Sequence, residues 1–421
     1  MTVAQSTTPL LSFYSHHDQW KASLVESMIG KKLDQLRTPS LIIDRAILKR
    51  NCDKLACITN DLNTKVRVHV KTHKTVEGTR MQLEGASTNA IVVSTMAEAH
   101  ALINSELTET KLLQDVLLGF PITSDKFSEI FELANKVPVF QIFIDNLATL
   151  EALEAYCFST NNAKINVFLK VDCGYGRAGV PINDSDTLTL AKRLDQSPYV
   201  HFNGIYSHAG HSYSSKSRTE ALEYLKNECD MGRQFRDYFV SNGVTIPQVS
   251  IGATPTVKAI TSFMKETDMK QILSGISEVH AGAFAFLDRQ QVSTGLGGYE
   301  EVAISVASRI ASVYKDRDSL LIDAGALAFS KDTAPQGGFG YVLDPAIKEP
   351  NVIASVAKIS QEHGILQVDS STLSRPELQV GKLIRVIPNH CCLTAACHLY
   401  YLIIEEGGDT VVDVWVPVRG W

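Results

Sequence analysis

The chain of 421 residues lacks several patterns that would assign it to a class at once. No apolar run approaches the roughly 20 residues that span a bilayer, so no membrane segment is expected. Residues 1–19 contain no basic stretch followed by an apolar core, so we expect no secretory signal. No block of like charges stands out, and the net charge of −6 gives no support to nucleic-acid binding.

Cysteine pairing patterns are also missing. The eight cysteines are spread along the chain without a C-x-x-C pair and without a disulfide framework. Reduced thiols fit this distribution, which predicts a cytoplasmic location. Only the cluster at 390–398 suggests chemistry.

The length of the chain exceeds the roughly 250–300 residues at which single cores stop growing, so two domains are expected. A polar leader, 1–35, could pack on the second domain. Residues 36–44 then predict a strand that feeds a helix over 45–59. Eight short apolar runs follow, each with room for a helix after it: 66–70, 90–93, 116–118, 139–144, 165–171, 202–206, 246–251 and 276–280.

Eight strand–helix units predict an α/β domain over 36–295, a (β/α)₈ barrel of the triose-phosphate-isomerase (TIM) type. An open doubly wound sheet is the alternative, but its usual Gly-rich fingerprint after the first strand is absent. From about residue 300 the sequence pattern changes to short apolar runs separated by Gly, Pro and polar turns. This change predicts a mostly β domain over 296–421. Its runs lie at 302–313, 319–323, 354–359, 383–387, 399–404 and 410–416.

Lys71 is the most informative residue of the barrel domain, because it follows the first predicted strand directly. Active sites of such barrels lie at the carboxyl ends of the strands. A lysine amine beside other positive groups and in low dielectric can attack a carbonyl and form a Schiff base. The plainer alternative is a basic strand end that faces water.

The loops after the later strands suggest a phosphate site. Gly252, Thr254 and Gly282 supply hydroxyl groups and exposed backbone N–H groups where barrels often bind phosphate. Ordinary tight turns would look the same. A lysine together with a phosphate site describes pyridoxal 5′-phosphate, whose ring also needs neighbours. Tyr206 and Tyr213 are candidates for contacts with that ring, or else pack on the barrel rim.

Two further groups complete the candidate site. Arg177, in a Gly-rich loop, could balance a carboxylate or brace its own loop. His390 and Cys392 follow an apolar strand; if that strand continues, the two residues face the same side and offer nitrogen and sulfur to zinc. Two ligands leave positions for water or substrate, which is typical of a catalytic metal. Alternatively, the cysteines are small core residues and His390 caps a turn.

Several segments together resemble the D-serine dehydratase family of fold-type III pyridoxal phosphate enzymes. They are TP at 38–39, RVHVKTHKT at 67–75, VST at 93–95, VDCGYGRAG at 171–179, YSHAGHSYSS at 206–215, SIGATPT at 250–256, SQEHG at 360–364 and PNHCC at 388–392. The resemblance covers about residue 35 to Trp421. It implies an alanine-racemase-type barrel plus a β domain, working as a homodimer on a small D-amino acid.

The resemblance also implies roles for individual residues. Lys71 would be the Schiff-base lysine. The residues implied to hold the cofactor are Tyr206, Tyr213, Gly252, Thr254 and Gly282. His390 and Cys392 would bind Zn²⁺. D-threonine aldolases have His-x-Asp where this chain has His-x-Cys, which favours the dehydratase.

The expected reaction is dehydration and deamination of D-serine to pyruvate and ammonia, extending to D-threonine and 2-oxobutanoate. The alternatives are a D-threonine aldolase, a D-threo-3-hydroxyaspartate dehydratase and a non-catalytic pyridoxal phosphate carrier. A racemase is disfavoured because it has no use for a metal pair.

Overall fold

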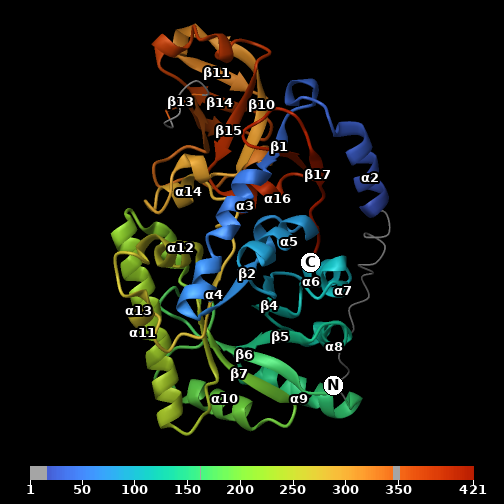
Figure 1. Ribbon diagram of the computed structural model, residues 1–421, viewed down its shortest axis with the longest axis vertical. Helices are drawn as coiled ribbons and strands as arrows, with labels where there is room; N and C mark the ends of the chain where they lie inside the picture. Colours follow the sequence, from blue (N-terminus) through green and yellow to red (C-terminus); the bar gives the residue numbers. More distant parts are fainter. Residues whose placement is uncertain (1–16, 162, 345–350) are drawn as a thin grey trace. The chain divides into compact units, whose positions relative to one another are not determined.

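The computed structural model describes residues 17–161, 163–344 and 351–421, and their contacts divide them into two units (Figure 1). The first unit comprises residues 53–282 and 418–421 of this set, and the second comprises 17–52 and 283–417. No helix of the described residues combines the length and the apolar character needed to cross a membrane.

The first unit is a closed barrel of eight parallel strands in sequence order. The strands are β2 (Lys65–His69), β3 (Ala90–Val93), β4 (Asp115–Pro121), β5 (Val139–Ile144), β6 (Ile165–Lys170), β7 (Val200–Tyr206), β8 (Gln248–Ile251) and β9 (Glu278–Ala281). Each lies on one of the eight apolar runs of the sequence, so the predicted barrel is confirmed.

Helices cover the outside of this barrel, as Figure 1 shows. They are α4 (Ala56–Leu62), α5 (Val76–Gly85), α6 (Met96–Ile103), α7 (Glu106–Glu109), α8 (Phe127–Ala134), α9 (Leu147–Thr160), α10 (Ser185–Gln196), α11 (Arg218–Ser241), α12 (Thr254–Phe263) and α13 (Met269–Ile272). Several begin at a polar residue whose side chain accepts a free backbone N–H of the first turn, as Thr75 does for α5 and Asn146 for α9. These caps fix where each helix begins after its strand.

The barrel interior has an apolar cluster and a polar layer. Apolar side chains from β3 to β7 form a core cluster: Val92, Leu117, Phe143, Phe168 and Tyr206. Towards the amino ends of the strands lie six hydrogen-bonded residues that we call the polar ring: Arg67, Asp115, Gln141, Asn166, Asn203 and Glu278. The Arg67 guanidinium, 1% exposed, pairs with Asp115 at 2.7 Å and with Glu278 at 2.9 Å.

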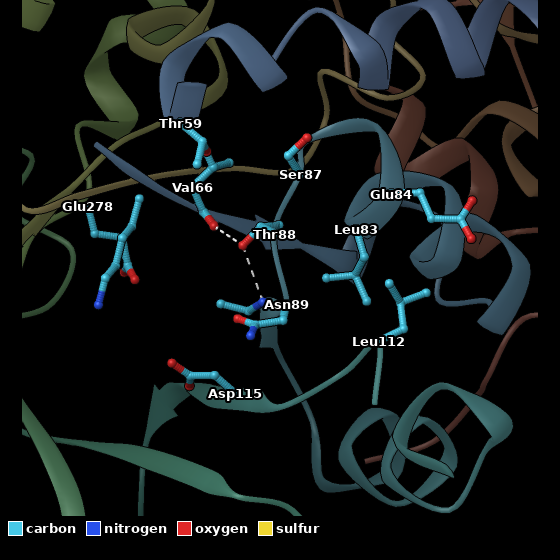
Figure 2. Close-up of a pocket in the computed structure, with 12 residues that line it drawn as sticks. Thr59, Val66, Leu83, Glu84, Ser87, Thr88, Asn89, Leu112, Asp115 and Glu278 are labelled. Atoms are coloured by element: carbon cyan, nitrogen blue, oxygen red, sulfur yellow. Dashed lines mark hydrogen bonds between the residues drawn. The ribbon is translucent and has the colours of Figure 1, made fainter. Parts of the chain in front are cut away.

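A hollow of about 450 Å³ opens at the same end of the barrel (Figure 2). It is lined by the first residues of four strands, among them Asp115 of β4 and Glu278 of β9. Thr88 closes one wall through a hydrogen bond to the carbonyl of Val66, at 2.5 Å. Active sites of this fold lie at the opposite, carboxyl ends of the strands. We therefore do not assign the hollow to the active site.

The second unit is built on a nine-stranded mixed sheet with the order β11-β14-β13-β12-β15-β10-β1-β16-β17. Its strands are β1 (Ser40–Asp44), β10 (Ile304–Tyr314), β11 (Ser319–Ile322), β12 (Gly340–Leu343), β13 (Val352–Ile359), β14 (Gly364–Gln367), β15 (Leu383–Pro388), β16 (Tyr401–Ile404) and β17 (Asp413–Trp415). Its helices are α2 (His17–Met28), α3 (Arg45–Asp53, its last residue in the first unit), α14 (Arg289–Val292), α15 (Ala326–Phe329) and α16 (Cys391–Ala396). The predicted mostly β domain is confirmed.

Two features of this sheet differ from the sequence analysis. Residues 36–52, which we had assigned to the barrel domain, lie in the second unit, because β1 pairs with β10 and β16. Strands β12 and β14 have no counterpart among the predicted runs. The described part of the leader packs on this sheet, since Leu24, Val25 and Met28 of α2 contact the core cluster around Ile42. Residues 1–16 of the leader lie outside the described residues.

Candidate active site

Lys71 lies on a short 3₁₀ turn, Val70–Thr72, directly after β2. Its backbone N–H donates to Nδ1 of His69 at 3.4 Å, and its side chain is half-buried. The neighbouring Lys74 amine is 2.9 Å from the Glu98 carboxylate, whereas the Lys71 amine has no hydrogen-bond or ion-pair partner among the described residues. The barrel therefore presents one unpaired amine at the end of its first strand.

Three imidazoles share this end of the barrel: His69, His208 and His280. Burial lowers the pKa of all three well below the usual histidine value, and neighbouring positive charges lower it further. For His69 the first of these charges is Lys71, and for His208 it is Lys170. The three rings are therefore neutral at pH 7 and can accept protons or hydrogen bonds. Nothing in the sequence analysis singled out His280.

A chain of hydrogen bonds sets the orientation of His280. Ser250 Oγ donates to Glu278 Oε1 at 2.7 Å and lies 3.1 Å from His280 Nδ1. The Ser250 hydroxyl donates its only proton to the Glu278 carboxylate, so towards His280 it can only accept. Nδ1 of the neutral His280 ring therefore carries the hydrogen, and Nε2 has the free lone pair. Nε2 is buried and has no partner among the described residues. The site thus contains an oriented acceptor that the protein itself does not satisfy.

Tyr206 is 4% exposed and packs in the apolar cluster of the barrel. Its ring stacks on that of His280, with centroids 3.9 Å apart and an angle of 10° between planes. The Lys170 amine lies 4.4 Å from the Tyr206 ring centroid. Burial lowers the pKa of Lys170 to about 7, and the charge of Arg177 acts in the same direction. Sequence analysis missed Lys170, because this lysine lies inside the predicted run 165–171 and not directly after it.

Gly252 and Gly282 lie where neighbouring strand ends approach closely. Gly252 has φ of +150°, and a side-chain carbon there would lie 2.2 Å from the carbonyl oxygen of His280. A side-chain carbon at Gly282 would lie 2.7 Å from the carbonyl oxygen of His69. Both positions therefore exclude any larger residue. Gly252 also donates its N–H to Glu228 at 3.0 Å, so this N–H is already in use.

Thr254 begins α12 at the carboxyl end of β8, and its buried Oγ1 has no partner among the described residues. The buried carboxylate of Glu228, on α11, organises the loops next to it. It accepts hydrogen bonds from Ser207 Oγ, from the backbone N–H groups of Ala209 and Gly252, and from Thr256 Oγ1. No sequence pattern marks Glu228, because it lies in the middle of a long helix.

Arg177 and Tyr213 lie on two loops at the carboxyl ends of the strands. The Arg177 loop is shaped by Asp172, whose Oδ1 accepts the N–H groups of Gly174, Tyr175 and Gly176. Arg177 is exposed and lies over the Tyr175 ring, 5.2 Å from its centroid. Tyr213 is half-buried on the 3₁₀ turn Gly210–Ser214 after β7.

His390 and Cys392 belong to the second unit, and the backbone predicted for them is wrong. Strand β15 ends at Pro388, and α16 begins at Cys391, so the two residues are not alternate positions of a strand. The helix begins here because Asp288 accepts the N–H of Cys391 at 2.7 Å and Thr394 donates to the carbonyl of His390 at 3.0 Å. Burial opposes protonation of His390, but a hydrogen bond with Cys392 and other neighbours raise its pKa to about 10. The two side chains thus converge, through a helix start rather than a strand.

Cys391 is fully buried, and its sulfur lies 3.9 Å from the sulfur of Cys392. Among the residues that the structure describes, no group of three or more His, Cys, Asp or Glu side chains is arranged to hold a metal ion. The donor set of the pair, one imidazole nitrogen and one thiol sulfur, is nevertheless the kind that zinc prefers.

Two protein-family models match this chain, one over most of the barrel and one over part of the second unit. The family model "Alanine racemase, N-terminal domain" matches residues 43–272, and the model "Putative serine dehydratase domain" matches residues 303–404. D-threo-3-hydroxyaspartate dehydratase has a similar structure, solved for a cysteine-to-alanine mutant in the metal-free form. It is 25% identical, covers 93% of this chain and 100% of its own, and has a TM-score of 0.80. The fold and the match to the alanine racemase family model place this chain in the class of alanine racemase-like proteins. The fold of this class is a pyridoxal phosphate fold.

The sequence relatives are more specific. D-serine dehydratase of Schizosaccharomyces pombe is 36% identical over 95% of this chain and 96% of its own length. D-serine dehydratase of Saccharomyces cerevisiae is 32% identical, with 93% and 98% covered. The chain belongs to the D-serine dehydratase family, and the predicted resemblance is confirmed. It is accordingly an enzyme of the lyase class.

Proposed function

We propose that this enzyme converts D-serine to pyruvate and ammonia, and D-threonine to 2-oxobutanoate, with pyridoxal phosphate on Lys71 and zinc on His390 and Cys392. The observation that carries the proposal is the unpaired Lys71 amine at the carboxyl end of β2, beside three neutral imidazoles. Family membership supports the substrate, since the relatives in S. pombe and S. cerevisiae bear the name D-serine dehydratase.

The barrel residues fit pyridoxal phosphate on structural grounds. Thr254 Oγ1 and His280 Nε2 are buried polar atoms without partners among the described residues, which is costly unless a ligand or ordered water satisfies them. Thr254, at the start of α12, would hold the phosphate beside Gly252 and Gly282. His280 would accept a hydrogen bond from the ring, and Tyr206 and Tyr213 would flank it. Pyridoxal phosphate, when bound, withdraws electrons from the α-carbon of an attached amino acid.

The remaining tasks fall to side chains of this chain. Lys71 would hold the cofactor, and its amine would also be placed to take the α-proton of the substrate. The positive charges of Lys71, Lys74 and Arg177 lower the pKa of the neighbouring His69 ring further, beyond the effect of its burial. Arg177, which is exposed on a loop at the carboxyl ends of the strands, would bind the substrate carboxylate.

The His390–Cys392 pair fits zinc by the chemistry and convergence of its donors. Hydroxide is a poor leaving group, because water has a pKa of about 15.7, while zinc-bound water reaches about 7. Zinc would therefore lower the cost of losing the β-hydroxyl, by an amount larger than a single hydrogen bond provides, about 0.5–1.5 kcal/mol. The similar D-threo-3-hydroxyaspartate dehydratase was solved as a cysteine-to-alanine mutant in a form described as metal-free, so that protein has a metal-bound counterpart.

The test is incubation of the purified protein with D-serine, D-threonine and their L-forms, with and without zinc. We expect a 2-oxo acid and ammonia from the D-forms alone, and loss of this activity after exhaustive chelation while the cofactor stays bound. Glycine and an aldehyde as products would identify an aldolase. Full activity after zinc removal, confirmed by metal analysis, would refute the role of the metal.

A D-threo-3-hydroxyaspartate dehydratase is the second candidate, favoured by the structural similarity to that enzyme. Adding D-threo-3-hydroxyaspartate to the same substrate panel separates the two, because the preferred substrate has the higher kcat/KM. A homodimer and a cytoplasmic location are part of the proposal. Analytical ultracentrifugation and fractionation of cells that produce the protein test them.

A further inference from the structure

Asp332 contacts the imidazole of His390 directly. Its Oδ2 lies 2.5 Å from Nδ1 of His390, and both side chains belong to the second unit. A carboxylate accepts and cannot donate, so Nδ1 carries the hydrogen of this bond. The bond leaves Nε2 as the ring nitrogen that can face a metal.

The segment that carries Asp332 is tied to the segment that carries His390. The backbone N–H of Asp332 donates to Ser330 Oγ at 3.2 Å, and its carbonyl accepts from Asn389 Nδ2 at 3.0 Å. Asn389, which precedes His390, is 1% exposed. Thr394 Oγ1 adds a bond to the carbonyl of Phe329 at 2.9 Å. Because the two segments are fixed to each other, the carboxylate lies at a defined place beside the ring.

We infer that Asp332 is a positioning residue for the metal, holding the His390 ring in the tautomer and orientation in which Nε2 and the Cys392 sulfur face the same ion. This inference rests on the proposed zinc site. A partner of this kind matters more here than in a closed four-ligand site. With two protein ligands, the ring has few other bonds to hold it, and a rotated or wrongly protonated imidazole removes half of the protein's donors.

A partly exposed ion pair is the plainer explanation. The side chains of His390 and Asp332 are 26% and 35% exposed, and ion pairs this exposed to water contribute little to stability. An ion pair without a metal role predicts a small change in stability and no change in zinc affinity. The two explanations therefore differ in a quantity that does not depend on turnover.

The experiment measures zinc affinity of the full-length protein by competition with a chelator of known affinity, and the absorption of the cobalt-substituted protein. The variants are Asp332→Asn and Asp332→Ala, with Asp332→Glu as the conservative variant and Asp316→Asn, an exposed aspartate of the same unit, as the matched control. We expect a loss of zinc affinity of about 10–100-fold for Asp332→Asn and Asp332→Ala. Asp332→Glu should recover part of it, and Asp316→Asn should be unchanged.

The cobalt spectrum separates positioning from collapse of the site. At saturating cobalt, the sulfur-to-metal absorption should remain in Asp332→Asn, because Cys392 is intact. Zinc affinities of the Asp332 variants within twofold of Asp316→Asn would overturn the inference. Equal affinity of wild type, His390→Ala and Cys392→Ala, or no zinc binding by wild type, would instead overturn the proposed zinc site.

Discussion

The two ends of the barrel both contain buried charged groups, but they differ in how these groups are paired. At the amino ends of the strands, the Arg67 guanidinium has two carboxylate partners, and the polar ring hydrogen-bonds each of its members. At the carboxyl ends, Lys71 has no partner among the described residues, and the pKa values of three imidazoles and Lys170 are lowered. Buried charge is neutralised at one end and left reactive at the other.

This contrast shows that burial of charge alone does not identify an active site. The pairing raises the pKa of Arg67 above its usual value, although burial opposes it, because Glu278 and Asp115 are so close. Strong pKa shifts occur at both ends, but at the carboxyl ends one of the shifted bases, His280 through its Nε2, has no partner among the described residues. The hollow of about 450 Å³ lies at the paired end, so the presence of a hollow does not identify the active site either.

Replacing Lys71 should give the largest effect on the reactive end. In Lys71→Ala we expect complete loss of the visible absorption band that a lysine-bound cofactor gives, because the neighbouring Lys74 amine is paired with Glu98. The free energy of unfolding should change by less than about 0.5 kcal/mol, since no bond of the Lys71 amine is lost. Spectra of Lys126→Ala, which alters an exposed lysine of the barrel unit, provide the control. A Lys71→Ala protein that keeps the band contradicts the assignment.

Replacing Arg67 should give the converse result. Arg67→Leu leaves Glu278 buried without its charge partner, and we expect a loss of about 3–5 kcal/mol in the free energy of unfolding, measured in urea. The absorption band should persist in the folded protein. Combining Arg67→Met with Asp115→Asn and Glu278→Gln should recover much of the stability, because no uncompensated charge remains. Unchanged stability in Arg67→Leu would show that the polar ring does not stabilise this end.

Ser250 lies between the two ends, and its replacement sharpens the comparison. Ser250→Ala leaves His280 Nδ1 without an acceptor and removes one partner of Glu278. We expect a loss of about 1–3 kcal/mol in stability, together with weaker cofactor binding, because the His280 ring is no longer oriented. Cofactor affinity, measured by titration of the apoenzyme, distinguishes this from a purely structural effect. Ser241→Ala, on an exposed helix end, is the matched control.

The last comparison concerns Lys170 and pH. Its pKa of about 7 in the folded protein lies below the ordinary value of 10.5, so the folded state binds fewer protons than the unfolded chain between these values. The free energy of unfolding therefore gains a contribution that rises from about pH 7 to pH 10.5. Lys170→Met should remove this rise and should be more stable than wild type at pH 7. Parallel pH dependences of the two proteins would place the Lys170 amine in water.

Sequence alone predicted the barrel well, because parallel strands that are buried on both faces are continuous apolar runs. All eight runs became strands, with ends displaced by a few residues. The sheet of the second unit was harder. Strand β1 lies between β10 and β16, and pairing over such a distance in the chain leaves no local pattern. Strand β14 has only four residues and follows a tight turn.

Site residues could be predicted from the sequence where their residue type is unusual directly after an apolar run. They could not be predicted where the residue type is ordinary for its position. Lys71 and the glycines at 252 and 282 stand out directly after apolar runs. Lys170, Glu228 and His280 act through contacts between separate strands and helices, which a single sequence does not reveal. The strand predicted through 390–392 was wrong, because a helix begins there, where the distant Asp288 accepts the N–H of Cys391.

The place of β1 in the second sheet has a consequence for synthesis of the chain. Its five residues, all buried in the finished sheet, leave the ribosome early, but residues 45–303 must follow before its first partner strand begins. All eight strands of the barrel are made during that wait, so the barrel can fold first. Meanwhile an apolar strand without partners is a hazard for aggregation. During synthesis this one segment therefore needs protection from aggregation, a need that ends once β1 is paired in the finished sheet.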